Sequence, residues 1–144
     1  MNIRPAIIII QDNKLLTLQY YYSNEKVNAL PGGNLEVGEY LETALKREME
    51  EELGMEIETQ GWAFIAEAFR NNKNTIHFIF NASIIKGIPI INPEETSANA
   101  IEWVDLNEIA NTNIYPNVKQ NIIDNFLKKC SDDLFLGPIE QKWY

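Results

Sequence analysis

Three glutamates, Glu48, Glu51 and Glu52, are spaced so that their carboxylates share one patch of a helix surface. Like charges at that spacing repel one another, and the repulsion grows as water is removed. Mg²⁺ and Mn²⁺ relieve it because these hard cations prefer carboxylate and carbonyl oxygens. Arg47, four residues before Glu51, is placed to pair with it and hold it in position. The spacing predicts a divalent-metal site, and the alternative is a solvated acidic helix that binds nothing.

The residues around these glutamates predict a turn followed by a helix. Residues 31–33, Pro-Gly-Gly, cannot continue a strand, and glycine lets the backbone approach a bound ion or phosphate closely. Glu39 falls just before the first helical turn, where a carboxylate favours the helix dipole. From Tyr40 the apolar residues recur at three- and four-residue spacing up to a helix stop at Gly54. These apolar residues are Leu41, Ala44, Leu45, Met49 and Leu53.

Residues 33–55 follow the pattern G-x5-E-x7-R-E-Φ-x-E-E-x-G-Φ, where Φ is apolar. The pattern resembles the Nudix box at every defined position. The resemblance covers about residues 3–130, and it implies an α/β/α sandwich with a mixed β-sheet between helices. It also implies a metal site that cleaves diphosphate linkages.

The resemblance assigns roles to the residues of the box. It implies that Glu48 and Glu52 are the primary metal ligands. The carbonyl of Gly32 or Gly33 would complete part of the shell. Glu51 would be a further ligand or would orient a water. The cofactor expected from this set is Mg²⁺ or Mn²⁺.

A second acidic position lies downstream of the box. Family members often carry a carboxylate in a loop just before a Glu-Trp strand, and Glu94 and Glu95 occupy that place before Glu102 and Trp103. Either is a candidate ligand or general base, and the alternative is an ordinary acidic loop. The expected reaction is attack of water on a phosphorus of a diphosphate bridge, with the metal neutralising phosphate oxygens and a carboxylate taking the proton.

The substrate is less constrained by the sequence. Subfamily markers of ADP-ribose, dinucleoside polyphosphate and NADH-cleaving members are absent downstream of the box, and what remains resembles a nucleoside triphosphate pyrophosphohydrolase. Arg4 and Arg70 are candidate phosphate contacts, and Asn117 is a candidate hydrogen-bond partner for a base. Each has ordinary surface polarity as its alternative. The candidates for stacking on a base are Tyr20, Tyr22, Phe78 and Phe80, and each has a place in the core or on the sheet surface as its favoured alternative.

Composition limits the classes of function. The chain has 144 residues, with 21 acidic and 12 basic side chains and a net charge of −9. This length predicts one domain over residues 1–144, and this charge argues against duplex nucleic acid as a partner, since binding there rests on Lys and Arg at phosphates. A small nucleotide substrate stays compatible because a metal supplies local positive charge. A Nudix-fold nucleotide-binding or regulatory module without turnover is the alternative to an enzyme.

The expected cellular location of the protein follows from features that the sequence lacks. Cys130 is the single cysteine, so no intrachain disulfide forms. The apolar run over residues 6–10 is too short for a signal peptide, and no run approaches a membrane span. We therefore expect a cytoplasmic protein with no membrane contact.

The rest of the chain predicts alternating strands and helices, hence an α/β or α+β class. Polar loops are expected at residues 23–26, 71–74 and 87–93. The C-terminal extension, residues 131–144, is too apolar for a free tail and is expected to pack on the domain or on a second copy, which would make a homodimer. The expected elements are strands over residues 6–10, 15–22, 57–69, 75–85 and 101–104, a helical turn over 106–110, and a last helix from Pro116 or Asn117 to about Lys129.

Overall fold

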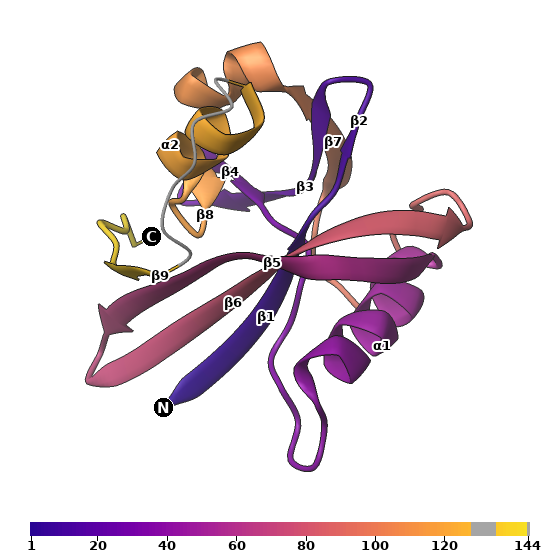
Figure 1. The fold of residues 1–144 in the computed structure, drawn as a ribbon, viewed down its shortest axis with the longest axis horizontal. Coiled ribbons are helices and arrows are strands. Elements are labelled where there is room, and N and C mark those ends of the chain that lie inside the picture. The colour runs from indigo at the N-terminus through magenta and orange to yellow at the C-terminus, as the bar shows by residue number, and fades with distance from the viewer. Residues whose placement is uncertain (128–134, 144) are drawn as a thin grey trace.

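The computed structural model describes residues 1–127 and 135–143, and its strands divide between two mixed sheets (Figure 1). The first sheet has the strand order β1-β6-β5-β9, and these strands are Asn2–Ile8, Lys73–Lys86, Glu56–Arg70 and Phe135–Pro138. The second has the order β2-β3-β4-β8, with β7 also paired to β3. Its strands are Ile10–Gln11, Lys14–Tyr22, Glu25–Ala29, Ile114–Tyr115 and Ala100–Asp105. The predicted mixed α/β class is confirmed.

Two helical layers complete the fold. Helix α1, Leu41–Leu53, ends at Gly54, whose φ of 64° is left-handed, as the glycine stop predicts. Helix α2, Lys119–Ile122, continues as a π-helical segment, η2, Ile123–Leu127, and a 3₁₀ helix, η1, covers Leu106–Asn111. The predicted start of the last helix was too early, because Asn117 bonds to the C-terminal segment instead of entering the helix. Its predicted end at Lys129 lies outside the described residues.

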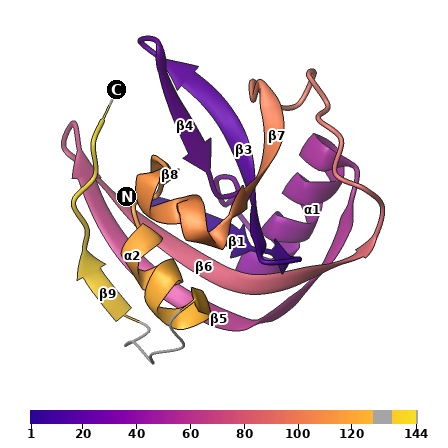
Figure 2. The same ribbon diagram turned by 90° about the horizontal axis from the view of Figure 1, so that it is seen from above.

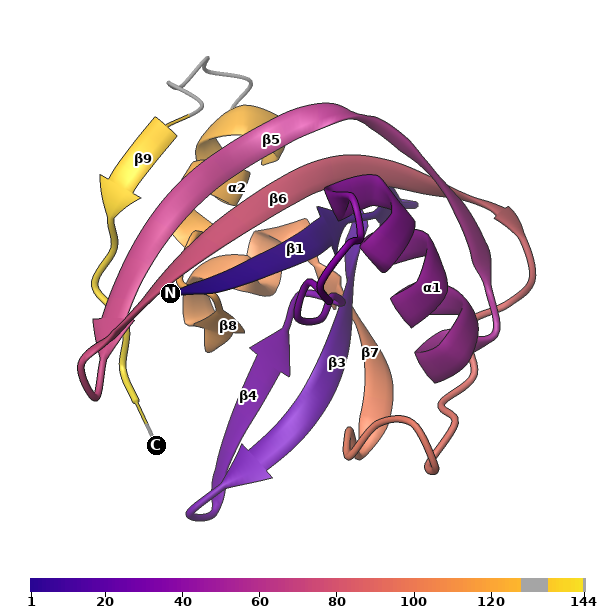
Figure 3. The same ribbon diagram turned by 90° about the horizontal axis from the view of Figure 1, so that it is seen from below.

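The two helices cover opposite faces of the first sheet. Ile7 of β1 and Ile9, just after the strand, pack in one core cluster with α1, through Leu45, Met49 and Leu53. The alternate residues, Ala6 and Ile8, pack in the other cluster with the α2 region, through Val118, Ile122 and Ile123. Successive side chains of a strand point to opposite faces, so one apolar run contributes to both cores. Figures 2 and 3 show the β5–β6 hairpin curving past both helices, with α1 nearer its open end.

Two-residue turns with positive φ join three antiparallel strand pairs. They are Asp12-Asn13, Ser23-Asn24 and Asn71-Asn72. Asparagine and aspartate tolerate the left-handed region that such hairpins require. The predicted polar loop over residues 23–26 was therefore wrong: the turn takes two residues, and β4 begins at Glu25. This hairpin matters for the site because β3 and β4 both reach the cavity described below.

The C-terminal extension packs on the domain over its described part. β9 pairs in parallel with β5, and Leu136 and Ile139 pack against the core cluster that contains α2. Cys130 lies outside the described residues. No helix in the described part of the chain is long and apolar enough to cross a membrane.

Candidate active site

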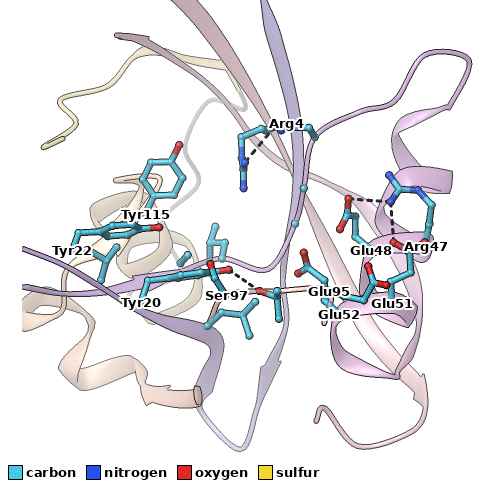
Figure 4. Close-up of a pocket in the computed structure, with 18 of the residues that line it drawn as sticks. Arg4, Tyr20, Tyr22, Arg47, Glu48, Glu51, Glu52, Glu95, Ser97 and Tyr115 are labelled. Atoms are coloured by element: carbon cyan, nitrogen blue, oxygen red, sulfur yellow. Dashed lines mark hydrogen bonds and ion pairs between the residues drawn. The ribbon is translucent and has the colours of Figure 1, made fainter. Parts of the chain in front are cut away.

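A cavity of about 710 Å³ lies between the acidic face of α1 and the ends of β3, β4 and β8 (Figure 4). Its size falls in the range of pockets that hold small molecules. It gathers nearly every residue that the sequence singled out as a candidate. The predicted site residues in its lining are Arg4, Tyr20, Tyr22, Gly32, Gly33, Arg47, Glu48, Glu51, Glu52, Arg70 and Glu95.

Glu52 is the most perturbed carboxyl group of the site. Burial first, and then the neighbouring carboxyl of Glu48, raise its pKa to about 8. Its Oε2 atom is buried with no hydrogen-bond partner among the described residues. Glu51 adds a smaller like-charge effect, while Arg4 acts in the opposite direction. A carboxyl that has one unpaired buried oxygen and faces a second carboxyl is a site that a cation would satisfy.

Arg47 ties the acidic residues together. Its Nε and Nη2 atoms donate to the two carboxylate oxygens of Glu39 at 2.8 and 2.9 Å, a bidentate pair. Nη1 donates to Glu48 Oε1 at 3.1 Å and to Glu51 Oε2 at 3.2 Å. The predicted pairing with Glu51 is confirmed, and Glu39 is the stronger partner. These hydrogen bonds lower the pKa of Glu39 and raise that of Arg47.

The glycine turn lies against this carboxylate cluster. A Cβ atom built on Gly33 would collide with the carboxyl group of Glu48, and one built on Gly32 would collide with the carbonyl oxygen of Pro5. Gly33 N donates to Pro5 O at 3.2 Å, so the turn is bonded to β1. Only glycine lets the backbone come this close to the acidic face.

The donor set fits a divalent cation. Glu48 and Glu52 offer adjacent carboxylates, Glu51 a third, and the turn glycines offer carbonyl oxygens, which are the oxygen ligands that Mg²⁺ and Mn²⁺ prefer. Within the described residues no three acidic, histidine or cysteine side chains already converge on one point. Arg47 holds two of the three carboxylates, those of Glu48 and Glu51, by hydrogen bonds beside Glu52.

The loop that carries Glu95 is fastened to the end of α1. Asn92 N donates to Glu52 O at 2.8 Å, and the Asn92 side chain donates to Glu51 O at 3.3 Å. These bonds satisfy carbonyls that the helix end leaves unpaired. Glu95 thereby reaches the cavity wall, whereas Glu94 does not line it. Of the two predicted alternatives, Glu95 is the one placed to act in the cavity.

The far end of the cavity is aromatic and basic. Tyr20 and Tyr22 of β3 stack with their ring centroids 6.0 Å apart and 13° between their planes. Tyr115 joins them from β8, and Figure 4 shows Arg4 between the tyrosines and the glutamates. Burial is the main cause of the raised pKa of Tyr20, whose hydroxyl lies 3.2 Å from Thr96 Oγ1. Metal and phosphates would fit at one end, and a ring at the other.

Three sequence candidates lie elsewhere. Asn117 does not line the cavity, because its side chain donates to Glu140 O at 2.9 Å. Phe78 and Phe80 also lie outside the lining and contact Trp62, with ring centroids 5.6 and 4.5 Å away. Both rings belong to the core cluster that packs against α1.

Sequence reasoning also missed cavity residues. It gave no site role to Tyr115, Ser97, Lys142 or Trp143, all of which line the cavity. Tyr115 follows a single isoleucine in a two-residue strand, which carries no periodic signal. The apolar C-terminal extension was a signal for packing, and nothing in its spacing indicated the cavity.

Comparisons with known proteins agree with this geometry. The model of the NUDIX domain matches residues 1–126. The NAD-capped RNA hydrolase NudC of Vibrio atlanticus (strain LGP32) is 26% identical over 129 residues, 84% of this chain; the chain spans only 44% of that relative's length. Among solved structures, the E. coli ORF135 protein has a TM-score of 0.76 at 20% identity, with 92% of this chain and 95% of that chain covered. A NUDIX hydrolase from Nitrosomonas europaea has a TM-score of 0.71 at 24% identity, with 90% of each chain covered.

Proposed function

This chain belongs to the NUDIX family, whose hydrolases act on phosphoric anhydride bonds, and we propose that it is a divalent-metal-dependent pyrophosphohydrolase of nucleoside triphosphates, ribo or deoxy. One observation carries the proposal. A single cavity joins a carboxylate cluster, with an unpaired buried oxygen on Glu52, to an aromatic and basic end. A nucleotide presents the same two parts, a polyphosphate that binds metal and a base that stacks.

Each acidic residue has a distinct part in the proposal. Glu48 and Glu52 would hold the cation, with the carbonyl of Gly32 or Gly33 beside them. When bound, Mg²⁺ or Mn²⁺ neutralises phosphate oxygens and lowers the pKa of a water. Arg47 keeps the carboxylates in position through its bonds to both Glu48 and Glu51.

Two carboxylates are placed to take the proton of the attacking water. Glu51 belongs to the α1 cluster, and Glu95 enters the cavity from the loop fastened to the end of α1. A general base must reach the water directly or through one further water. Arg4, which lies between the glutamates and the tyrosines, is placed to contact the phosphates (Figure 4).

The triphosphate assignment is supported by what the cavity offers. Tyr20 and Tyr22 provide stacked rings at its far end, and Arg4 and Arg70 provide positive charge in its wall. Relatives act on different compounds by their names: NudC of Vibrio atlanticus on NAD-capped RNA, and a structural neighbour from Streptococcus suis on ADP-ribose. The test must therefore include these compounds.

The purified chain should be assayed with Mg²⁺ or Mn²⁺ against the eight common (d)NTPs, ADP-ribose, NADH, a nucleotide sugar, a dinucleoside polyphosphate and coenzyme A, with the products identified. We expect nucleoside monophosphate and pyrophosphate from at least one triphosphate, and no product in EDTA. A preference for ADP-ribose or NADH would overturn the triphosphate assignment and leave the reaction class intact. Tight nucleotide binding without any product would instead identify a binding module.

A further inference from the structure

The described part of the C-terminal extension, residues 135–143, lies outside the residues that the family model matches. Two of its residues, Lys142 and Trp143, nevertheless line the same cavity as the glutamates of α1. In Figures 2 and 3 the segment runs from β9 past the tip of the β5–β6 hairpin and ends between that tip and the tip of the β3–β4 hairpin. Part of the cavity wall is thus built from chain beyond the family domain.

Hydrogen bonds fix the path of this segment. Ile139 N donates to Glu67 O at 3.0 Å, one step beyond the pairing of β9 with β5. Asn117 then binds the segment twice. Its main-chain N–H donates to Gln141 Oε1 at 2.8 Å, and its side-chain amide donates to Glu140 O at 2.9 Å. These hydrogen bonds therefore fix the positions of the next two residues, Lys142 and Trp143.

Both residues make contacts across the cavity end. Lys142 Nζ donates to Glu25 Oε2 at 2.6 Å, which ties the segment to the start of β4. The Trp143 ring lies edge-on to Tyr115, with centroids 6.0 Å apart and 64° between planes. The guanidinium carbon of Arg70 lies 5.1 Å from the Trp143 ring centroid. Tyr115 and Arg70 also line the cavity, so Trp143 continues its aromatic wall.

We propose that the C-terminal segment completes the base-binding end of the cavity, and that Trp143 is a specificity-determining residue that contacts the base. The inference rests on the proposed function, because it takes the substrate to be a nucleotide. Every base has a π face, and stacking on an aromatic side chain tolerates different bases. Tyr20 and Tyr22 supply rings from β3 of the second sheet. Trp143 supplies a ring from the C-terminal segment, which joins the first sheet through β9.

The test measures binding without turnover. Dissociation constants are determined calorimetrically in Mg²⁺ for α,β-methylene analogues of the deoxynucleoside triphosphates, which resist cleavage at that bridge, and for inorganic tripolyphosphate, which has no base. The variants are Trp143→Ala and Trp143→Phe, with Phe135→Ala as the matched control. Phe135 lies on β9 of the same segment, is 61% exposed and does not line the cavity.

We expect Trp143→Ala to weaken binding of the best analogue about tenfold, the usual effect of losing one stacking ring. The dissociation constant for tripolyphosphate should stay within twofold of the parent value. Trp143→Phe should recover most of the loss, and Phe135→Ala should match the parent. In turnover, Trp143→Ala should raise KM and leave kcat within twofold. Unchanged analogue binding, or equal weakening of analogue and tripolyphosphate, would overturn the inference.

The inference and the proposed function fail in different ways. Analogue binding that depends on Trp143, in a protein that cleaves no phosphoric anhydride, would refute the hydrolase and keep the base contact. Triphosphate cleavage with a KM that Trp143→Ala leaves unchanged would keep the hydrolase and refute the base contact. Thermal unfolding of each variant separates both results from a loss of fold, and Trp143→Phe keeps the test decisive if the alanine variant unfolds.

Discussion

Glu52 and Glu48, four residues apart on α1, form a half-buried pair in which one carboxyl faces the other. Burial, helped by the neighbouring carboxyl, raises the pKa of Glu52 to about 8. Without a metal, we therefore expect the Glu48–Glu52 pair to hold one proton near neutral pH. A divalent cation would replace that proton, so metal binding should release it and should tighten as the pH rises.

Glu52→Gln should lower kcat at least a hundredfold, because the amide keeps the shape of the side chain and removes the ligand charge. The metal-free variant should melt at the same temperature as the parent or higher, since it no longer buries an ionisable group beside Glu48. Steady-state kinetics with Mg²⁺ and thermal unfolding in EDTA measure the two effects. Normal turnover by this variant would refute the ligand assignment.

Glu50→Gln is the matched control for that experiment. Glu50 is a glutamate of the same helix, but it is exposed and does not line the cavity. We expect kcat and KM of this variant within twofold of the parent. A comparable loss in both variants would mean that net charge on the helix, and not the position of Glu52, sets the rate.

Arg47→Lys should lower activity about tenfold while the charge is kept, the usual effect of losing a residue that orients metal ligands. A lysine ammonium cannot reproduce the bidentate bond to Glu39 and, at the same time, the bonds to Glu48 and Glu51. The Mg²⁺ concentration for half-maximal activity should rise in parallel. If that concentration stays constant while kcat falls, Arg47 acts on substrate and not on the metal ligands.

The burial of His77 should make the stability of the folded protein sensitive to acid. It is 1% exposed, neither ring nitrogen has a hydrogen-bond partner among the described residues, and burial lowers its pKa to about 4. Unfolded histidine binds a proton near pH 6.5. The stability that the neutral ring provides is therefore complete above pH 6.5 and is lost as the pH falls toward 4.

The comparison of the parent with His77→Phe isolates this effect, because the carboxylates titrate in both proteins. The difference between their melting temperatures should be constant above about pH 7 and should shift in favour of the variant toward pH 4. A difference that does not change with pH would show that His77 does not resist protonation in the folded chain.

The acidic half of the site was predictable because its signal is local. Glu48, Glu51 and Glu52 share a face by helical spacing alone, and Arg47 reaches Glu51 through the same geometry. Short-range periodicity determines these relationships, so they could be predicted from the spacing of the residues.

The base end of the cavity was less predictable because it is built from distant segments. Tyr115 stands in a two-residue strand, and Trp143 reaches it only through the pairing of β9 with β5. Asn117 was assigned to a base from its type alone, and its amide binds the C-terminal segment instead. Pairing between strands far apart in sequence leaves no spacing pattern, which is why these residues were found only in three dimensions.

The two turn glycines make a contrasting pair for mutation. A Cβ atom on Gly33 would meet the carboxyl end of the Glu48 side chain, which can move aside, whereas one on Gly32 would meet Pro5 O and the Cα of Ala6, which belong to the backbone of β1. Gly32 also bridges Ala6 directly.

Gly33→Ala should therefore displace a metal ligand and leave the fold largely intact. We expect kcat to fall at least tenfold, the half-maximal Mg²⁺ concentration to rise, and the melting temperature to change little. Gly32→Ala should destabilise the protein by about 1–3 kcal/mol, the usual cost of forcing an atom into a packed interior. Metal titrations of activity and chemical denaturation of both variants measure these effects. If Gly33→Ala kept full activity, Glu48 could not be held against the turn as a ligand, because the added methyl group occupies the place of its carboxyl.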